Sequence, residues 1–423
     1  MTTTSKPKLH FEFIENDALE IIKKLQQRDY VTYLVGGCVR DLLLGILPKD
    51  FDIATMALPS EVKKCVPQSY IIGKRFRLVL AKRKNTLYEI ATFRKNSPSG
   101  EEEPSTEEHE NPDELAEIST GKIIGDNFFG SPEEDAFRRD FTINSLFYDP
   151  YDDQLHDFCN GLEDLNQRVI KMIGDPYVRL EEDPIRIMRG IRLAHKIEFD
   201  LEPKLREAMT KTAHTLKTAA LPRKREEFIK WFRVKDPSLP FLEAFDLGVL
   251  EYISPTLNQH LKNKEQGNEF IKYLKTINEI SFNKEETLFY YGLIVSAFVR
   301  SFFPNLLIKE SIKIRDILEN ETLVQFMKFE LGLFNYEQDL IARAFSLKNL
   351  LSKRVQLEKK GDKTIQSLFR NEAFPLALFL SKRDFYLSPE DWTFWYDSYH
   401  KAIPQLLASQ PLRERKPKRK KKK

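Results

Sequence analysis

Residues 33–55 read YLVGGCVRDLLLGILPKDFDIAT and join a pair of glycines to two aspartates that are separated by one apolar residue. A β-rich run precedes Gly36 and Gly37, a segment with helical apolar spacing follows them, and Asp50 and Asp52 lie in a second β-rich run. Residues i and i+2 of a strand point to one face, so the spacing predicts that the two carboxylates project together. Such a pair suits Mg²⁺, which keeps open positions for phosphate oxygens.

The glycine pair adds the anion-binding half of this prediction. Gly36 and Gly37 at a strand-to-helix turn allow backbone N–H groups to approach a phosphate. Arg40 lies one turn later, followed by Asp41, and is a candidate for a fork-shaped phosphate contact. An exposed strand face or a turn would also explain two isolated aspartates. The glycines and the Arg-Asp pair, in fixed order ahead of the aspartates, favour the metal and phosphate site.

This ordered pattern resembles the first motif of the class II nucleotidyltransferases, the family of bacterial poly(A) polymerases and CCA-adding enzymes. The resemblance extends over about residues 30–235 and implies an α+β protein with a small mixed β-sheet head followed by an all-α neck, body and tail. The expected domains are a nucleotidyltransferase head (palm), a helical neck for nucleotide selection, a helical body and tail for RNA binding, and a disordered basic tail, at residues 1–150, 151–235, 236–410 and 411–423.

A third carboxylate is expected from the strand that follows. The sequence predicts a helix over 13–28 ahead of the first motif, and strands over 71–81 and 86–93 after it. Glu89 lies between the apolar Tyr88 and Ile90 and is therefore expected to face away from them. A salt bridge from an edge strand to a nearby lysine would also explain this glutamate. The resemblance implies the family's third acidic position, which completes metal coordination or assists the attacking hydroxyl.

Residues 128–150 read FFGSPEEDAFRRDFTINSLFYDP and place Arg138, Arg139 and Asp140 between a short helix and a strand predicted over 141–148. Adjacent arginines at such a junction can hold ribose and phosphate groups, and Asp140 can orient one of them. A buried structural Arg–Asp pair is the alternative. The string RRDFTINSL resembles the family segment that binds the sugar and triphosphate of the nucleotide.

Residues 177–199 read YVRLEEDPIRIMRGIRLAHKIEF and predict a helix that is capped by Asp183 and carries arginines at every third position. A carboxylate and a guanidinium can read a base edge through paired hydrogen bonds. A helix cap with solvated arginines is the alternative. Glu182, Asp183 and Arg186 match the family's EDxxR motif, which implies a protein template for the incoming base, and Arg189 is included in the nucleotide site.

The composition describes a globular chain of 423 residues with 41% hydrophobic and 31% charged residues. No apolar run reaches the ~20 residues of a membrane span, and the N-terminus lacks a secretory pattern, so a cytoplasmic location is expected. Two segments are strongly charged. Residues 96–121 are predicted to form a mobile acidic loop, and residues 411–423 carry nine Lys and Arg, as in a polyanion-binding arm or a solubilising tail.

Within the family, IIGKRFRL at residues 71–78 resembles the bacterial poly(A) polymerase signature, although Ala81 departs from it. The sequence therefore favours a template-independent adenylyltransferase that adds AMP to RNA 3′ ends in mRNA processing, with Mg²⁺ or Mn²⁺ as cofactor and ATP as substrate. RNA-decay or RNA-chaperone proteins are further candidate partners. A CCA-adding enzyme is the alternative, and an inactive RNA-binding protein is disfavoured because Asp50, Asp52 and Glu89 are all present.

Overall fold

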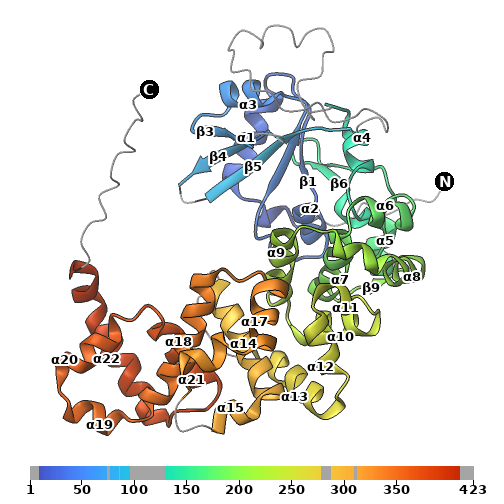
Figure 1. Cartoon of the computed structure of the whole chain (residues 1–423). Coiled ribbons are helices and arrows are strands. Elements are labelled where there is room, and N and C mark those ends of the chain that lie inside the picture. Colours follow the sequence, from blue (N-terminus) through green and yellow to red (C-terminus); the bar gives the residue numbers. More distant parts are fainter. Residues whose placement is uncertain are drawn as a thin grey trace, which may run out of the picture. The chain divides into compact units, whose positions relative to one another are not determined.

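The computed structural model describes residues 9–73, 77–84, 86–95, 129–277, 287–308 and 312–409 (Figure 1). The chain divides into two compact units, Met1–Thr212 and Ala213–Lys423. The predicted acidic loop and basic tail lie outside the described residues. Among the helices that the structure describes, none combines the length and the hydropathy needed to cross a membrane.

The first unit is built on a mixed sheet of seven strands in the order β3-β4-β5-β2-β1-β6-β7 (Figure 1). Strands β2 and β5 are parallel, and the other neighbouring pairs are antiparallel. The strands are β1 (Thr32–Val35), β2 (Asp52–Thr55), β3 (Ser69–Ile72), β4 (Leu78–Arg83), β5 (Thr86–Thr92), β6 (Leu146–Asp149) and β7 (Gln154–Asp157). Since β3 and β4 lie between β2 and β5 in the chain, the central parallel pair is assembled from segments that are distant in sequence.

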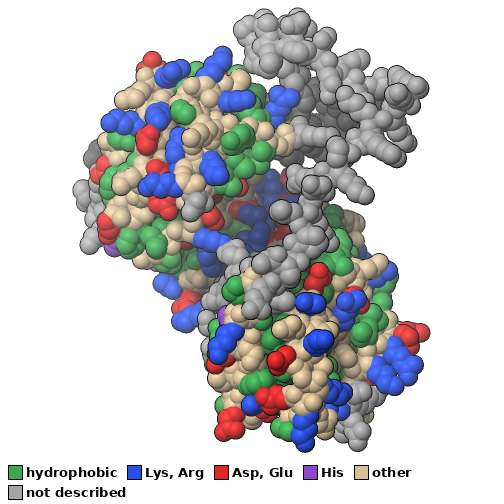
Figure 2. All heavy atoms as spheres, turned by 90° about the vertical axis from the view of Figure 1, so that its left-hand side faces the viewer, with side chains coloured by type: hydrophobic (Ala, Val, Ile, Leu, Met, Phe, Trp, Pro, Cys, Tyr) green, Lys and Arg blue, Asp and Glu red, His purple; other side chains and the backbone are tan. Residues whose placement is uncertain are grey.

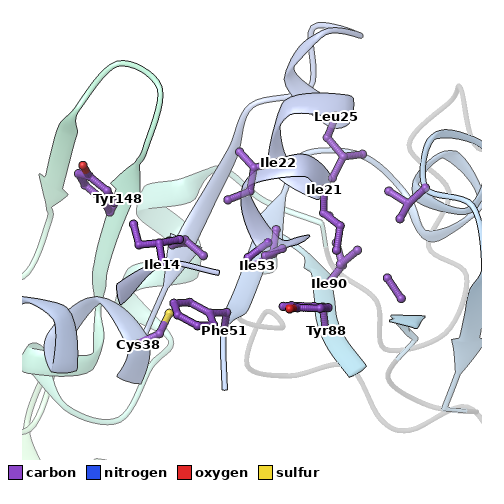
Figure 3. Close-up of a cluster of buried hydrophobic side chains, with 14 of the residues drawn as sticks. Ile14, Ile21, Ile22, Leu25, Cys38, Phe51, Ile53, Tyr88, Ile90 and Tyr148 are labelled. Atoms are coloured by element: carbon purple, nitrogen blue, oxygen red, sulfur yellow. The ribbon is translucent and has the colours of Figure 1, made fainter. Parts of the chain in front are cut away.

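One face of this sheet is closed by α1 (Asn16–Gln26) and α3 (Pro59–Cys65) over a large apolar cluster. Figure 3 shows Ile21 and Leu25 of α1 above Ile53 and Ile90, which come from β2 and β5. Because neighbouring residues of a strand point to opposite faces, burial of these two isoleucines turns the residue before each of them toward the other face.

The other face carries a smaller apolar cluster that includes Val35, Ala54, Phe93, Ala136 and Phe147. Ala136 comes from α4 (Pro132–Phe137), which is capped because the Ser131 hydroxyl accepts the N–H of Glu134 and the Glu134 carboxylate accepts the N–H of Ser131. The remaining helices of the first unit are α2 (Gly37–Leu43), α5 (Gly161–Gln167), α6 (Pro176–Glu182), α7 (Ile185–Ile197) and α8 (Pro203–Thr212), beside a two-stranded sheet of β8 (Val169–Ile170) and β9 (Asp200–Leu201).

Several predicted elements are confirmed and two are wrong. The helix predicted over 13–28 is α1, and the strand predicted over 86–93 is β5. The strand predicted over 71–81 is instead two antiparallel strands, β3 and β4, and the chain leaves β3 at Gly73 with φ of +88°. The strand predicted over 141–148 begins with a 3₁₀ turn, η4 (Thr142–Asn144), because Ser145 bonds back to the carbonyl of Thr142.

The second unit is helical throughout its described residues. It contains η5 (Ala213–Lys217), α9 (Leu221–Trp231), α10 (Ser238–Asp246), α11 (Leu250–Ile253), α12 (Pro255–Leu261), α13 (Lys264–Lys275), α14 (Thr287–Phe302), α15 (Pro304–Ile308), α16 (Ile314–Leu318), α17 (Glu321–Val324), the π-helix η7 (Gln325–Glu330), α18 (Asn335–Leu351), α19 (Arg354–Lys359), α20 (Asp362–Phe369), α21 (Phe374–Arg383) and α22 (Pro389–Ser409). The face shown in Figure 2 carries basic and acidic side chains interspersed rather than one continuous basic surface.

Candidate active site

The three predicted catalytic carboxylates gather around the central parallel strands. Asp52 opens β2 and is the direct lateral partner of Glu89 on β5. Asp50 precedes the strand and is exposed, as are Asp52 and Glu89, whereas Phe51, Ile53, Tyr88 and Ile90 are buried. Residues paired across neighbouring strands project to the same face, so Asp52 and Glu89 lie on the sheet face opposite to α1 and α3.

Asp52 lies in an unfavourable electrostatic environment. Although its side chain is accessible to solvent, surrounding protein atoms reduce its hydration, and the negative charges of Glu89 and Asp50 add to this effect. Together they raise the pKa of Asp52 to about 6, while the positive charge of Arg139 acts in the opposite direction. Reduced hydration and neighbouring negative charge both disfavour the ionised Asp52 carboxylate, and a bound cation would offset both effects.

The glycine turn lies directly against these groups. Gly36 has φ of +77°, and a Cβ at this position would lie 3.0 Å from Nη1 of Arg139 and 3.9 Å from Oδ2 of Asp52. Only glycine fits here without strain, because both the backbone conformation and the close approach exclude a side chain. Gly37 begins α2, and a Cβ there would have an ordinary contact, 3.5 Å, with Nη2 of Arg40.

Arg40 and Asp41 lie beneath the turn. Arg40 is 4% exposed, and its Nε donates a hydrogen bond to Oδ1 of Asp41 at 2.8 Å while Nη1 donates to Oδ1 of Asn144 at 2.6 Å. The ammonium of Lys196, on α7, lies 3.5 Å from the other oxygen of Asp41. In this structure the Arg40 guanidinium is therefore engaged by the protein and supports the turn from below.

Arg138 and Arg139 share one buried carboxylate that the sequence analysis did not single out. Asp135 is 2% exposed and accepts a hydrogen bond from Nε of Arg138 at 2.9 Å and from Nη2 of Arg139 at 2.9 Å. Burial by itself would raise the pKa of Asp135, but the two guanidinium groups outweigh burial and lower it. Arg138 and Arg139 follow Asp135 by three and four residues, a spacing that brings side chains together on a helix, so the sequence could have predicted this pairing.

Asp140 connects the head motif to α7. Its Oδ2 accepts a hydrogen bond from Nε of Arg189 at 2.7 Å, and its Oδ1 accepts the backbone N–H of Phe141 at 2.9 Å. Burial opposes ionisation of Asp140, but the ion pair with Arg189 and these hydrogen bonds lower its pKa. A structural Arg–Asp pair was the alternative explanation for this motif. Asp140 does form such a pair, but with Arg189 and not with Arg138 or Arg139.

The predicted base-reading residues are tied to the same motif through Arg179, which the sequence analysis missed. Nη2 of Arg179 donates to the carbonyl oxygens of Arg138 at 2.8 Å and Arg139 at 2.9 Å, and Nη1 donates to Glu182 at 2.7 Å. Arg186 donates to the carbonyl of Arg179 at 2.6 Å and to Glu182 at 3.1 Å.

Asp183 joins the two neck helices. It follows α6, and its Oδ1 accepts the N–H of Ile185 at 3.3 Å, at the first residue of α7. The predicted helix cap is therefore displaced by one residue: Pro184 is the N-cap of α7, and Asp183 is the C-cap of α6. The EDxxR residues and the arginine pair consequently lie in one connected network within the first unit.

The donor set fits a magnesium ion that is shared with a substrate. Among the described residues, no group of three or more His, Cys, Asp or Glu side chains is arranged to hold a metal by itself. Asp50 and Asp52 offer hard oxygen ligands at an exposed edge, and Mg²⁺ commonly takes one or two carboxylates and completes its shell with water and phosphate oxygens. Manganese prefers the same oxygen donors.

Comparison with known proteins agrees with this arrangement. Residues 32–171 match the model of the poly A polymerase head domain, and residues 198–261 match a model described as the probable RNA and SrmB-binding site of polymerase A. Poly(A) polymerase I of Haemophilus influenzae is 35% identical over 250 residues, which is 59% of this chain and 53% of that protein. Residues 32–171 thus correspond to a poly A polymerase head domain, and the chain is similar to both poly(A) polymerases and CCA-adding enzymes.

Both branches of this nucleotidyltransferase family are similar to the chain. A CCA-adding enzyme of Lactobacillus helveticus is 36% identical over 213 residues, which is 50% of this chain and 49% of that enzyme. The chain thus spans about half the length of the curated relatives it matches. The crystal structure of the Bacillus stearothermophilus CCA-adding enzyme in complex with CTP aligns with 94% of this chain and 83% of its own, at a TM-score of 0.58 and 23% identity. The predicted fold class, a mixed-sheet head followed by helices, is confirmed.

Proposed function

We propose that this protein is a poly(A) polymerase that transfers AMP from ATP to the 3′-hydroxyl of RNA without a template. The observation that carries the proposal is the register of Asp52 beside Glu89, with Gly36 and Arg139 packed against them. This arrangement supports a site in which carboxylates proposed as metal ligands, a glycine turn and a cation surround one point. The similarity to poly(A) polymerase I supports the choice of ATP.

In this proposal Asp50 and Asp52 hold Mg²⁺ or Mn²⁺, and Glu89 completes the acidic group. A bound divalent ion there would supply Lewis-acid activation of the hydroxyl and neutralisation of phosphate charge. The protein's own part is to position the reactants. The pairing of β2 with β5 fixes the carboxylates. The hydrogen bond from the buried Arg40 of α2 to Asn144 fixes the glycine turn that faces them.

The nucleotide is proposed to lie between the turn and the neck. Gly36 and Gly37 let the backbone approach the triphosphate, and Arg40 with Asp41 holds that turn in place. Arg138 and Arg139 are proposed to contact the sugar or the phosphates, and their hydrogen bonds to Asp135 orient the two guanidinium groups.

Base selection is proposed for Glu182, Asp183 and Arg186, with Arg189 and Asp140 orienting this segment. Arg186 and Glu182 already share a hydrogen bond, so a base edge would meet a preformed donor and acceptor pair. The head, neck, body and tail boundaries predicted at residues 150, 235 and 410 remain part of this proposal, as do a cytoplasmic location and RNA-decay or RNA-chaperone partners.

CCA addition to tRNA is the second candidate function. It is favoured by the similarity to the Lactobacillus helveticus enzyme and by the fold shared with the Bacillus stearothermophilus enzyme. An inactive RNA-binding protein is opposed by the intact acidic group of Asp50, Asp52 and Glu89.

Extension of two labelled RNAs distinguishes these functions. One is a generic oligomer with a 3′-hydroxyl, the other a tRNA that lacks its terminal CCA, and each is incubated with single nucleotides and with mixtures. Long ladders on the oligomer with ATP alone are expected. Addition of three nucleotides to the tRNA that requires CTP and ATP would replace the proposal with CCA addition, and no extension of either RNA would refute both. Asp50→Ala and Asp52→Ala serve as the inactive controls.

A further inference from the structure

The second unit contains a cleft of about 950 Å³ that is separate from the head motifs. It is formed by α13, α14, α15 and the C-terminal end of α21, and residues 198–261, which match the RNA-binding family model, do not contribute to its lining. Lys272, Arg300 and Arg383 line it together with Phe385, and two carboxylates, Glu265 and Glu269, also face it.

Phe385 has a strained backbone conformation that no burial of its side chain offsets. It is 88% exposed, and its φ is +51°, in the left-handed region. It follows α21 at the position where the chain turns back: the N–H of Phe385 bonds to the carbonyl of Lys382 at 3.2 Å, and the N–H of Tyr386 bonds to that of Ser381 at 2.9 Å. Glycine is strongly favoured at this position, because a side chain is strained there. Phenylalanine accepts that strain and gains no burial in return.

The residues on both sides hold Phe385 in place. Asp384 is buried and forms an ion pair with Lys348, and it also accepts a hydrogen bond from Tyr273 at 2.8 Å. On the other side, the hydroxyl of Tyr386 donates to Oδ1 of Asn349 at 2.8 Å. An exposed aromatic ring on an anchored turn loses little conformational freedom when it stacks on a ligand.

The cations beside Phe385 are arranged for an anionic ligand. Arg383 is 8% exposed and supports the cleft from within the protein: its Cζ lies 4.1 Å from the centroid of the Tyr273 ring, and its Nη2 donates to the carbonyl of Tyr273 at 2.8 Å and to the hydroxyl of Thr276. Arg300 is exposed on α14, and Lys272 is exposed in the last turn of α13. The carboxylates come from the first two turns of α13, so the lining is acidic near the start of this helix and basic near its end.

We infer that this cleft binds single-stranded RNA, with a base stacked on Phe385 and phosphates held by the exposed Lys272 and Arg300. Stacking on an aromatic ring next to cations is the general mode of single-strand binding. An RNA strand also matches the mixed lining, since its phosphates suit the cations and the amino groups of its bases can donate to the glutamates. The inference depends on the proposed function only in taking RNA as the ligand.

Fluorescence anisotropy of the full chain tests this inference. The probes are a 5′-fluorescein-labelled 15-nucleotide oligoadenylate RNA and an abasic strand of equal length, with EDTA present and ATP omitted. Phe385→Gly is expected to weaken oligoadenylate binding about five- to hundredfold, which corresponds to the loss of one stacked base, and to leave abasic binding unchanged. The same variant relieves the backbone strain, so its melting temperature is expected to stay equal or to rise by about 1–4 °C.

Charge variants provide the second test. Arg300→Gln is expected to lower the slope of log K against log salt by about 0.7, the value for one phosphate contact on a single strand. Lys359→Gln, which removes an exposed charge on α19, is the matched control and is expected to leave the affinity for oligoadenylate unchanged.

Two outcomes overturn the inference: oligoadenylate affinity unchanged in a folded Phe385→Gly protein, or equal losses for both strands. The first would also be the result if the cleft bound a protein segment instead. Because binding is measured without catalysis, absence of nucleotide addition together with Phe385-dependent binding would refute the proposed function alone. Nucleotide addition with Phe385-independent binding would refute this inference alone.

Discussion

Replacing Asp52 with asparagine is expected to stabilise the metal-free protein at neutral pH and to abolish nucleotide addition. The reason is that reduced hydration, and to a lesser extent the negative charges of Glu89 and Asp50, raise the pKa of this carboxyl to about 6. A group whose pKa is higher in the folded than in the unfolded state binds more protons when folded, so its ionisation destabilises the fold. The full effect of such a rise is at most about 3 kcal/mol, and solvent access to Asp52 reduces our expectation to about 1 kcal/mol.

The expected measurement is a series of thermal denaturation curves from pH 3.5 to 8 in EDTA. Stability of the wild type should fall, relative to Asp52→Asn, as pH rises from about 4 to about 6, and the difference should stay constant above that. For a unit of this size, 1 kcal/mol corresponds to about 2–4 °C in melting temperature. Asp200→Asn, which removes an exposed charge from β9 of the same unit, controls for net charge.

Adding magnesium should make the wild type more stable than Asp52→Asn, the reverse of the order expected in EDTA. With Asp52 as a ligand of the proposed metal site, the wild type is expected to gain stability from the ion, whereas Asp52→Asn should gain less. If Asp52→Asn is no more stable than the wild type at pH 7 in EDTA, the electrostatic description of the acidic group is wrong. If the variant keeps full activity, the metal assignment is wrong.

Three further substitutions test other parts of the structure. Gly36→Ala should destabilise the protein by about 1–2 kcal/mol and impair addition, whereas Gly37→Ala, with its ordinary contacts, should be tolerated; urea denaturation and extension assays measure both. Arg179→Met leaves two backbone carbonyls of the head without their donor, and we expect a loss of about 2–4 kcal/mol with a raised KM for ATP; an unchanged KM would argue against the network. Arg225→Lys removes the two-pronged contact with Glu337, so the second unit should lose about 1–2 kcal/mol in denaturant titrations, and equal stability would contradict this.

The alternation of residues along strands was the most reliable signal in the sequence. It correctly predicted that Asp52 and Glu89 face away from the buried residues beside them, whereas Asp50, predicted to lie on the same strand as Asp52, precedes β2. It could not predict that β2 and β5 are neighbours, because β3 and β4 intervene in the chain and strand order depends on tertiary packing. The family resemblance, rather than residue spacing, supplied that part of the site.

Side-chain hydrogen bonding was the least predictable feature. Burial of Arg40 beneath the turn depends on Asn144, which lies 104 residues later in the chain. Arg179 acts on backbone carbonyls, and these carry no signal in the side-chain pattern. The failed strand prediction over 141–148 has the same origin, because a local hydrogen bond from Ser145 formed a turn where apolar alternation favoured a strand.

The ion pair between Asp140 and Arg189 also limits how enzymes of this kind can exchange segments by recombination. Its carboxylate comes from the head motif and its guanidinium from a helix 49 residues later. A crossover between these positions joins each group to a neighbour that evolved with a different partner. Asp140 is largely buried whereas Arg189 is 40% exposed, so a mismatched pair is expected to destabilise the protein by about 1–3 kcal/mol, a substantial part of the stability of a domain. Functional chimaeras are therefore expected to have their junctions outside this interval, so that the segment around Asp140 and helix α7 are inherited together.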